Sequence, residues 1–161
     1  MIDVVELDAV AVEPFVPAIE ADGMKPDLHD GIWLGAREDG TVVGVARVFA
    51  RDGKFMLEDV WVTPERRSRG AGIALVRAAQ SRFTHLWLIC DEDMLEYYAY
   101  QGFIPASDEL PAALADVSRT KGYWQPDDHV HVAMLWDRFS SNQAVSDEEL
   151  EALTREANGD V

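Results

Sequence analysis

The stretch that links the central strand to the following helix reads Val60-Trp61-Val62-Thr63-Pro64-Glu65-Arg66-Arg67-Ser68-Arg69-Gly70-Ala71-Gly72-Ile73-Ala74-Leu75. An apolar run from Met56 ends at Thr63-Pro64, where proline lacks a backbone donor and disfavours helix just before it, so we expect a strand to stop there. Apolar residues after Gly72 recur at helical spacing and predict a helix. Three arginines and two glycines precede that helix, whose first N–H groups have no partner. This unit is suited to a phosphate-bearing ligand.

Two segments of the chain together indicate a family. Arg67, Gly70 and Gly72 follow the pattern Arg/Gln-x-x-Gly-x-Gly/Ala, and downstream Tyr98-Ala99-Tyr100-Gln101-Gly102-Phe103 follows Tyr-x-x-x-Gly-Phe. In this order they resemble the acyl-CoA-binding motif and the Tyr-x-x-x-Gly-Phe segment of the GNAT superfamily of N-acetyltransferases. The resemblance implies an α+β fold with a mixed central sheet, an antiparallel meander followed by βαβα, flanked by helices.

The glycines also fit other patterns. Gly70-x-Gly72-x-x-Leu75, with an acidic residue at Asp91, imitates a dinucleotide-binding fingerprint. However, its third position is leucine, and an arginine-rich loop separates the strand from the glycines. No Gly-Lys-Ser/Thr follows, which excludes a nucleotide P-loop. A plainer alternative is that the glycines shape a turn and the arginines form a solvated patch.

Composition narrows the class of protein. A length of 161 residues suits one compact domain, and no apolar run approaches the ~20 residues needed to span a bilayer. The N-terminus lacks the pattern of a signal peptide. The single cysteine, Cys90, cannot form an internal disulfide, so we expect a cytoplasmic protein.

The charge of the chain narrows its partners. With 30 acidic and 14 basic residues the net charge is −16, which disfavours nucleic acid and anionic membranes as partners. The acidity fits cationic acceptors such as amines, or serves only solubility. His129 and His131 share a strand face, but no matched Cys or Asp cluster accompanies them, so we expect no metal site.

The order of apolar runs and turns predicts the α+β class. Pro14 and Pro17 confine a helical region at about residues 9–21, because proline fits only a first turn. Turns at Asp39-Gly40 and Asp52-Gly53 predict an antiparallel meander. The expected elements are strands at 4–7, 31–37, 41–50 and 55–62, a helix at 70–82, a buried strand at 86–90 parallel to its predecessor, a helix from 91 to about 100 ended by Gly102, and a strand from 103.

The C-terminal third departs from the family pattern. Residues 106–128 form an insertion, in which Ser107 caps a helix to about residue 117 or 118, before a last strand at 129–137. The insertion fits either a roof over the acceptor site or a contact in a homodimer. We expect one domain at residues 1–139 and an acidic tail helix within 140–161, capped at Ser146.

The resemblance implies acetyl-CoA as co-substrate. The loop residues Arg67, Ser68, Arg69, Gly70, Ala71 and Gly72, with Ile73, would bind the CoA pyrophosphate. The edge of the strand Val60-Trp61-Val62 would pair with the pantetheine arm, and an N–H near Val60 would polarise the thioester carbonyl. The acetyl group would pass directly to an amine of a small molecule or protein.

Two residues are candidates for proton transfer. By resemblance, Tyr98 is the general acid, unless it only packs over the ligand; Tyr97 and Tyr100 are expected to point elsewhere. Glu58 is the candidate base, directly or through a water, unless a carboxylate of this strand pairs with Arg47. In a regular strand Asp59 would face the opposite side from Glu58.

Asp91 departs from the family pattern, because many relatives have an asparagine there that helps bind the cofactor arm. An aspartate loses the amide donor and adds negative charge near a polyanionic ligand, unless its side chain only caps the helix. A second hypothesis is therefore an acyl-CoA-binding or regulatory domain without turnover. No motif in the sequence identifies the acceptor.

Overall fold

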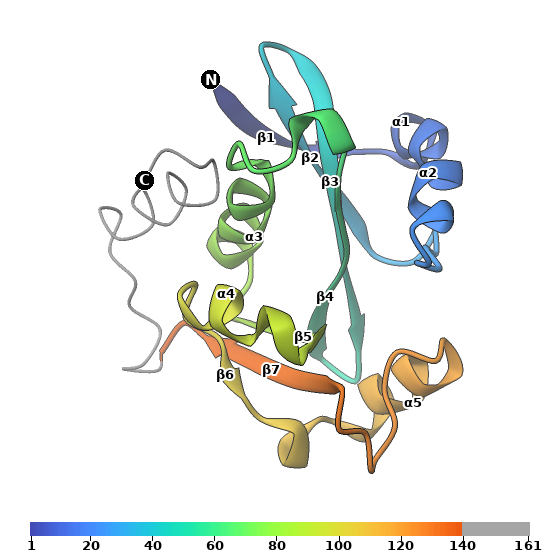
Figure 1. The fold of residues 1–161 in the computed structure, drawn as a ribbon, viewed down its shortest axis with the longest axis vertical. Helices are drawn as coiled ribbons and strands as arrows, with labels where there is room; N and C mark the ends of the chain where they lie inside the picture. The colour runs from blue at the N-terminus through green and yellow to red at the C-terminus, as the bar shows by residue number, and fades with distance from the viewer. Residues whose placement is uncertain (140–161) are drawn as a thin grey trace.

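The computed structural model describes residues 1–139, which form a seven-stranded sheet with helices on both faces (Figure 1). The strands are β1 (Ile2–Leu7), β2 (Ile32–Glu38), β3 (Thr41–Arg51), β4 (Lys54–Val62), β5 (His85–Asp91), β6 (Ile104–Pro105) and β7 (His131–Asp137). The α-helices are α1 (Ala9–Val12), α2 (Val16–Ala21), α3 (Ala71–Arg82), α4 (Leu95–Ala99) and α5 (Ala112–Thr120). The predicted tail helix lies outside the described residues.

The strands lie in the order β1-β2-β3-β4-β5-β7-β6. All neighbouring pairs are antiparallel except β4 and β5, which are parallel and joined through α3. The predicted antiparallel meander followed by a strand–helix–strand crossover is therefore confirmed, as is the α+β class. None of the helices within residues 1–139 is long and apolar enough to cross a membrane.

Each face of the sheet has its own helices (Figure 1). On one face, which we call the α3 face, Leu75, Val76 and Ala79 of α3 pack against Leu34 and Leu88. The opposite face, which we call the α5 face, has two separate clusters. The α1–α2 cluster contains Val12, Ile19, Trp33, Val45 and Trp61, and the α5 cluster contains Phe49, Met56, Trp87, Leu114 and Ala133.

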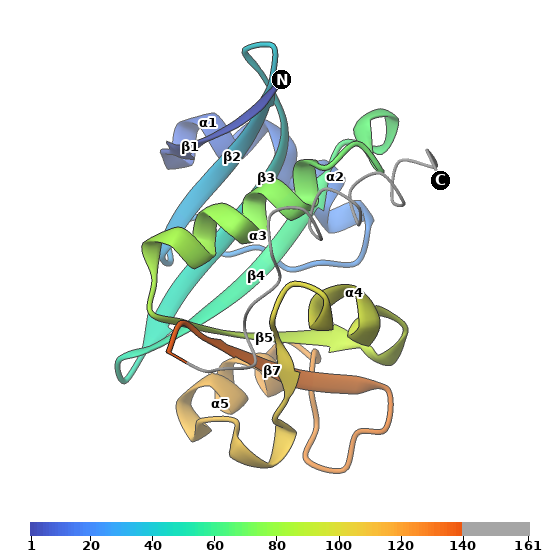
Figure 2. The same cartoon turned by 90° about the vertical axis from the view of Figure 1, so that its left-hand side faces the viewer.

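The parallel strands β4 and β5 are in register at only one pair, Met56 with Trp87. Beyond this pair they diverge, and α4 lies beside the opening (Figure 2). The edge of β4 that faces β5 is therefore unpaired from Glu58 to Val62, while the other edge stays paired with β3. The divergence leaves space in the middle of the sheet.

The insertion differs from its prediction in detail. The helix expected from Ser107 is instead a 3₁₀ turn, Ser107–Glu109, followed by α5 from Ala112. Pro111 separates them with extended backbone angles and no N–H to continue a helix. The last strand begins at His131, not residue 129, because Asp128 accepts hydrogen bonds from the N–H groups of Val130 and His131 at 2.7 and 3.0 Å.

Asp59 does not face away from Glu58, because β4 is not a regular strand: it contains a β-bulge. Val45 pairs with Trp61 and Arg47 with Glu58, so that Ala46 alone faces both Asp59 and Val60. Asp59 has a left-handed backbone, with φ +57°. The extra residue breaks the side-chain alternation of the strand. Glu58 and Asp59 therefore both reach Arg47 on the α5 face.

Gly31 permits the close approach of the first loop to β3. Its φ is +89°, and a Cβ there would lie 2.2 Å from the Val48 backbone oxygen. Gly40 has a similar φ of +86°, but a Cβ there would meet nothing within 4 Å.

Gly40→Ala should lower the free energy of unfolding by about 1–2 kcal/mol, because of its left-handed backbone alone. Gly31→Ala should cost clearly more, because the Val48 carbonyl must move. Urea unfolding of both variants tests this, and equal losses would contradict it.

Candidate functional site

A cavity of about 510 Å³ lies at the N-terminal end of α3, and we call it the α3 cavity. Its lining residues come from the end of β4, the following loop, the first turn of α3, α4 and the loop after α2: Asp22, Met24, Val60, Trp61, Val62, Arg66, Arg67, Ser68, Gly70, Ala71, Gly72, Ile73, Met94, Tyr97 and Tyr98. Nine of the predicted cofactor-binding residues are among them. Arg69 and Asp91 are not.

The first turn of α3 is open toward this cavity. Gly70 is the N-cap with φ +93°, and no side chain caps this end of the helix. The first N–H groups of a helix have no intrahelical partner, and the macrodipole adds partial positive charge there. Because Gly70, Ala71, Gly72 and Ile73 line the cavity, these donors are available to an anionic group.

Arg67 is already engaged by the protein. Its Nε donates to the Val62 carbonyl at 2.8 Å, and its Nη2 lies 2.9 Å from Asp22 Oδ2. Asp22 also accepts a hydrogen bond from Trp61 Nε1 at 2.7 Å, and this bond, with Arg67, lowers the pKa of the Asp22 carboxyl. A carboxylate thus lies beside the open end of α3. The sequence did not indicate it, because Asp22 lies 45 residues from Arg67.

The other two arginines of the loop share one carboxylate. Arg66 Nη1 and Arg69 Nη1 each lie 3.5 Å from Glu38 Oε1. Arg66 also lines the α3 cavity, whereas Arg69 does not. The three loop arginines are therefore paired with acidic side chains rather than exposed as a free cationic patch. Their charges reach a ligand only in competition with these pairs.

A second cavity of about 420 Å³ lies where β4 and β5 diverge, and we call it the β4–β5 cavity. It shares Asp22, Met24, Val60, Met94 and Tyr98 with the α3 cavity, so the two spaces adjoin. Its other lining residues are Gly23, Met56, Leu57, Glu58, Asp59, Leu88, Ile89, Cys90, Asp91, Tyr123 and His131. The cleft thus contains both predicted catalytic residues, Glu58 and Tyr98.

Tyr98 lies at the junction of the two cavities. Burial raises the pKa of its phenol, with smaller contributions from Tyr97 and Cys90, so the side chain stays protonated at neutral pH. Its ring packs edge-on against Phe103. Tyr97 was expected to point elsewhere, but it also lines the α3 cavity. Its hydroxyl lies next to Gly72, 3.3 Å from where a Cβ on that residue would be. Tyr100 is 51% exposed.

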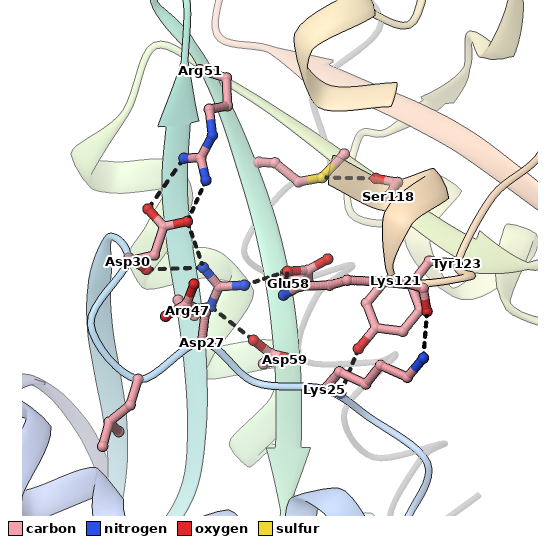
Figure 3. A network of polar contacts seen from close by, with 12 residues as sticks. Lys25, Asp27, Asp30, Arg47, Arg51, Glu58, Asp59, Ser118, Lys121 and Tyr123 are labelled. Atoms are coloured by element: carbon pink, nitrogen blue, oxygen red, sulfur yellow. Dashed lines mark hydrogen bonds and ion pairs between the residues drawn. The ribbon is translucent and has the colours of Figure 1, made fainter. Parts of the chain in front are cut away.

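A buried guanidinium organises the β4 wall (Figure 3). Arg47 is fully buried, and its Nε lies 2.8 Å from Asp59 Oδ2. Its Nη1 donates to the Asp30 carbonyl at 2.9 Å, and its Nη2 is ion-paired with Glu58 Oε2. The predicted alternative, that a carboxylate of this strand pairs with Arg47, is thus what the structure has, and two carboxylates do so.

Glu58 is paired with two cations, but its buried position disfavours the ionised carboxylate. Burial and the neighbouring Asp59 raise the pKa of its carboxyl, although Lys121 and Arg47 oppose the shift. Lys121 Nζ lies 3.2 Å from Glu58 Oε2. A carboxylate with a raised pKa is a better proton acceptor than an ordinary one at neutral pH.

The insertion contributes the outer wall of the β4–β5 cavity. Tyr123 lines it, and Lys121 follows α5 directly (Figure 3). The Tyr123 hydroxyl accepts a hydrogen bond from the Lys25 N–H at 2.6 Å, and Lys25 Nζ donates to the Lys121 carbonyl at 3.1 Å. Burial raises the pKa of Tyr123 to about 12. The insertion therefore closes one side of the β4–β5 cavity.

Asp91 lines the β4–β5 cavity at its β5 end and makes no capping hydrogen bond. Instead, its Oδ1 lies 3.2 Å from His131 Nε2, and His131 Nδ1 lies 2.6 Å from Asp128 Oδ2. Backbone N–H donors from His131 and Val130 lower the pKa of Asp128 to about 2. Pairing across β5 and β7 joins these residues, which spacing in the sequence did not indicate. Within residues 1–139, no group of three or more His, Cys, Asp or Glu side chains, this one included, is arranged so that it could hold a metal ion.

Comparison with known proteins identifies a family. A family profile described as "Acetyltransferase (GNAT) family" matches residues 4–103. The match begins within β1 and ends at Phe103, directly before β6, so it includes the parts of both cavities that β4, α3 and α4 form. No curated protein sequence matches the chain.

Solved structures share the fold. N-acetylglutamate synthase from Neisseria gonorrhoeae, complexed with coenzyme A and N-acetyl-glutamate, superimposes with a TM-score of 0.67 at 16% identity, over 87% of this chain but only 36% of that one. The IAA acetyltransferase from Bacillus cereus gives a TM-score of 0.63 at 16% identity, covering 85% and 99% of the two chains. PaiA N-acetyltransferase from Thermoplasma acidophilum, in complex with coenzyme A, gives 0.58 at 14%, covering 85% and 99%. Identities this low establish the fold and not the substrate.

Removing the Arg47 guanidinium should destabilise the protein strongly. Arg47→Met leaves the Glu58 and Asp59 carboxylates buried without their shared partner, which should cost about 3–5 kcal/mol of unfolding free energy. Arg37→Met is the matched control, since Arg37 pairs with Asp3 at the surface and should change stability far less. Urea unfolding measures both. A small loss in Arg47→Met would contradict the importance of this network.

Proposed function

Because the chain belongs to the acetyltransferase (GNAT) family, we propose that it is an acetyl-CoA-dependent N-acetyltransferase, which moves an acetyl group directly from CoA to an amine of a small molecule or protein. One observation supports this most. The open first turn of α3 adjoins, through Val60 and Tyr98, a cleft that contains a buried carboxylate. An anion bound at the first turn of α3 and an amine beside Glu58 could thus belong to two substrates that meet near Val60 and Tyr98.

The cofactor lies along the α3 cavity in this proposal. Its pyrophosphate accepts hydrogen bonds from the first N–H groups of α3, in the segment from Arg67 to Ile73. Its pantetheine arm pairs with the free edge of β4 at Val60, Trp61 and Val62, which no strand covers on the side of β5. The thioester then reaches the junction near Val60 and Tyr98, where a backbone N–H can stabilise the developing oxyanion.

Glu58 and Tyr98 are the proposed proton-transfer residues. Glu58, whose raised pKa suits a base, removes a proton from the acceptor ammonium, directly or through a water. The free amine attacks the thioester carbon, the carbon–sulfur bond breaks, and Tyr98 gives its proton to the departing thiolate. The nitrogen of the new amide loses its second proton to water, and a proton from water restores the Tyr98 phenol. Burial raises the pKa of Cys90 to about 11, so its thiol is a poor nucleophile, which favours direct transfer over an acetylated cysteine.

A second candidate is an acyl-CoA-binding domain without turnover. Its specific support is the negative charge near the proposed cofactor: Asp22 beside the open end of α3 and Asp91 at the end of β5. Both carboxylates are paired, with Arg67 and His131 respectively, so their charge is partly compensated. Measured turnover separates the two candidates.

Binding of acetyl-CoA should depend on Arg67 and Asp22 in opposite ways. Arg67→Ala should weaken binding roughly tenfold or more, because it removes a cation and leaves Asp22 uncompensated. Asp22→Asn should tighten it, since the amide can still accept from Trp61. The double variant should recover much of the loss. Gly72→Glu, which places a carboxylate in the α3 cavity, should abolish binding. Calorimetry with acetyl-CoA and with CoA measures the affinity of each variant. Unchanged affinity in all variants would exclude this site.

Turnover should depend on Glu58 and Tyr98 without a change in cofactor affinity. Glu58→Gln and Tyr98→Phe should each lower kcat roughly hundredfold or more. Because the base must be ionised, wild-type kcat/KM should fall as the pH drops through the raised pKa of Glu58, and Glu58→Gln should lose this limb. Exposed Tyr100→Phe is the matched control and should behave like wild type. Release of the CoA thiol with a panel of amines measures the rate. Bound acetyl-CoA without release would favour the non-catalytic candidate.

A further inference from the structure

Asp59 has a carboxylate oxygen without a partner. Its side chain is 1% exposed, and Oδ2 is paired with Arg47, but Oδ1 is buried and accepts no hydrogen bond from the part of the chain that the structure describes. Asp59 also lines the β4–β5 cavity. A buried carboxylate oxygen without a donor is costly, and native proteins rarely leave one unless a water, an ion or a ligand completes it. The β-bulge keeps Asp59 on this face at the expense of a left-handed backbone, φ +57°.

The surroundings of Asp59 suit a positively charged donor. Glu58 lies next to it, and the rings of Tyr98 and Tyr123 line the same cavity. Carboxylates pair with an ammonium, and aromatic faces attract one. The protein itself places an ammonium in this environment (Figure 3): Lys121 Nζ lies 3.2 Å from Glu58 Oε2 and 5.9 Å from the centre of the Tyr123 ring.

The same cavity offers nothing for a carboxylate on the acceptor. Within residues 1–139, His131 is the one basic side chain that lines it, and both its ring nitrogens already face the carboxylates of Asp91 and Asp128. Two further cations lie nearby. The Lys121 ammonium is paired with Glu58, and Arg47 is fully buried, with a protein partner for each of its three nitrogens. A carboxylate placed there would face Glu58, Asp59 and Asp91 without a free cation. Like charges placed side by side in an interface are strongly unfavourable.

We propose that the acceptor is a cationic amine that carries no carboxylate, and that its ammonium donates a hydrogen bond to Asp59 Oδ1 in the β4–β5 cavity. The proposal rests on the proposed function, whose acceptor it narrows. Asp59 then binds and orients the amine, and the adjacent Glu58 takes the proton. The same charges disfavour amino acids and other acceptors whose carboxylate would lie in this cavity together with the amine.

Matched pairs of amines test the proposal on the full chain. Phenethylamine differs from phenylalanine by a carboxylate beside the amine, and butylamine differs from γ-aminobutyrate by one at the far end. In each pair the amine without a carboxylate should have at least about tenfold higher kcat/KM. Calorimetry of the same amines, with and without CoA, should give the same preference in affinity. This binding readout does not need turnover, so a failure of catalysis and a failure of this proposal are distinguishable.

Substitution of Asp59 tests its role. Asp59→Asn should raise the KM and Kd for phenethylamine and butylamine roughly tenfold or more and leave the affinity for acetyl-CoA unchanged. Asp30→Asn is the matched control, because Asp30 belongs to the same Arg47 network but does not line the cavity, and its amine affinity should match wild type. If Asp59→Asn does not fold, the preference of the wild-type protein for amines without a carboxylate decides whether the proposal holds.

Three outcomes overturn the proposal. The first is that the carboxylate-bearing member of either pair binds as well as its partner or better. The second is that neither member of either pair binds. The third is that folded Asp59→Asn keeps wild-type affinity for the amines. If instead acetyl-CoA does not bind to the wild-type protein, the proposed function fails, whereas the preference among amines still decides whether Asp59 forms an ammonium site.

Discussion

The single register pair between β4 and β5 is the constraint on which the rest of the site depends. Parallel pairing begins and ends at Met56 and Trp87, because the two strands separate beyond that point. Their separation exposes one edge of β4, brings α4 to the opening and connects the α3 cavity with the β4–β5 cavity. A fully paired sheet would have no such passage, since side chains and ladder hydrogen bonds would fill it.

The bulge in β4 adds a second feature at the same place. It turns two consecutive carboxylates toward one side of the sheet, where the buried Arg47 guanidinium binds both. Two buried carboxylates would repel each other strongly without this cation. Arg47 thus stabilises the arrangement, and it leaves Asp59 Oδ1 without a donor. The insertion supports the same wall, since Lys121 and Tyr123 contact it from α5 and the following loop.

Acidic partners also moderate the arginine-rich loop. In a chain of net charge −16, Glu38 and Asp22 pair with Arg66, Arg67 and Arg69. The loop is therefore held in place before any ligand arrives, and the N–H groups of α3 are the donors without a protein partner at this end. A phosphate-bearing ligand has to compete with two carboxylates, so its affinity reflects the difference between the pairs formed and the pairs lost.

The sequence alone determined the class, the element order and most of the residues that line the α3 cavity, because these depend on local signals. Alternating apolar runs, two Asp-Gly turns and Pro64 define the meander, and the Arg67–Gly72 spacing defines the loop. Only the tertiary structure decided which side chains contact each other across the site. The bulge that turns Asp59, the pairing of Asp22 with Arg67, and the Asp91–His131–Asp128 array join residues distant in sequence or break the strand alternation. Such contacts depend on strand register and packing, which no local pattern of residues encodes.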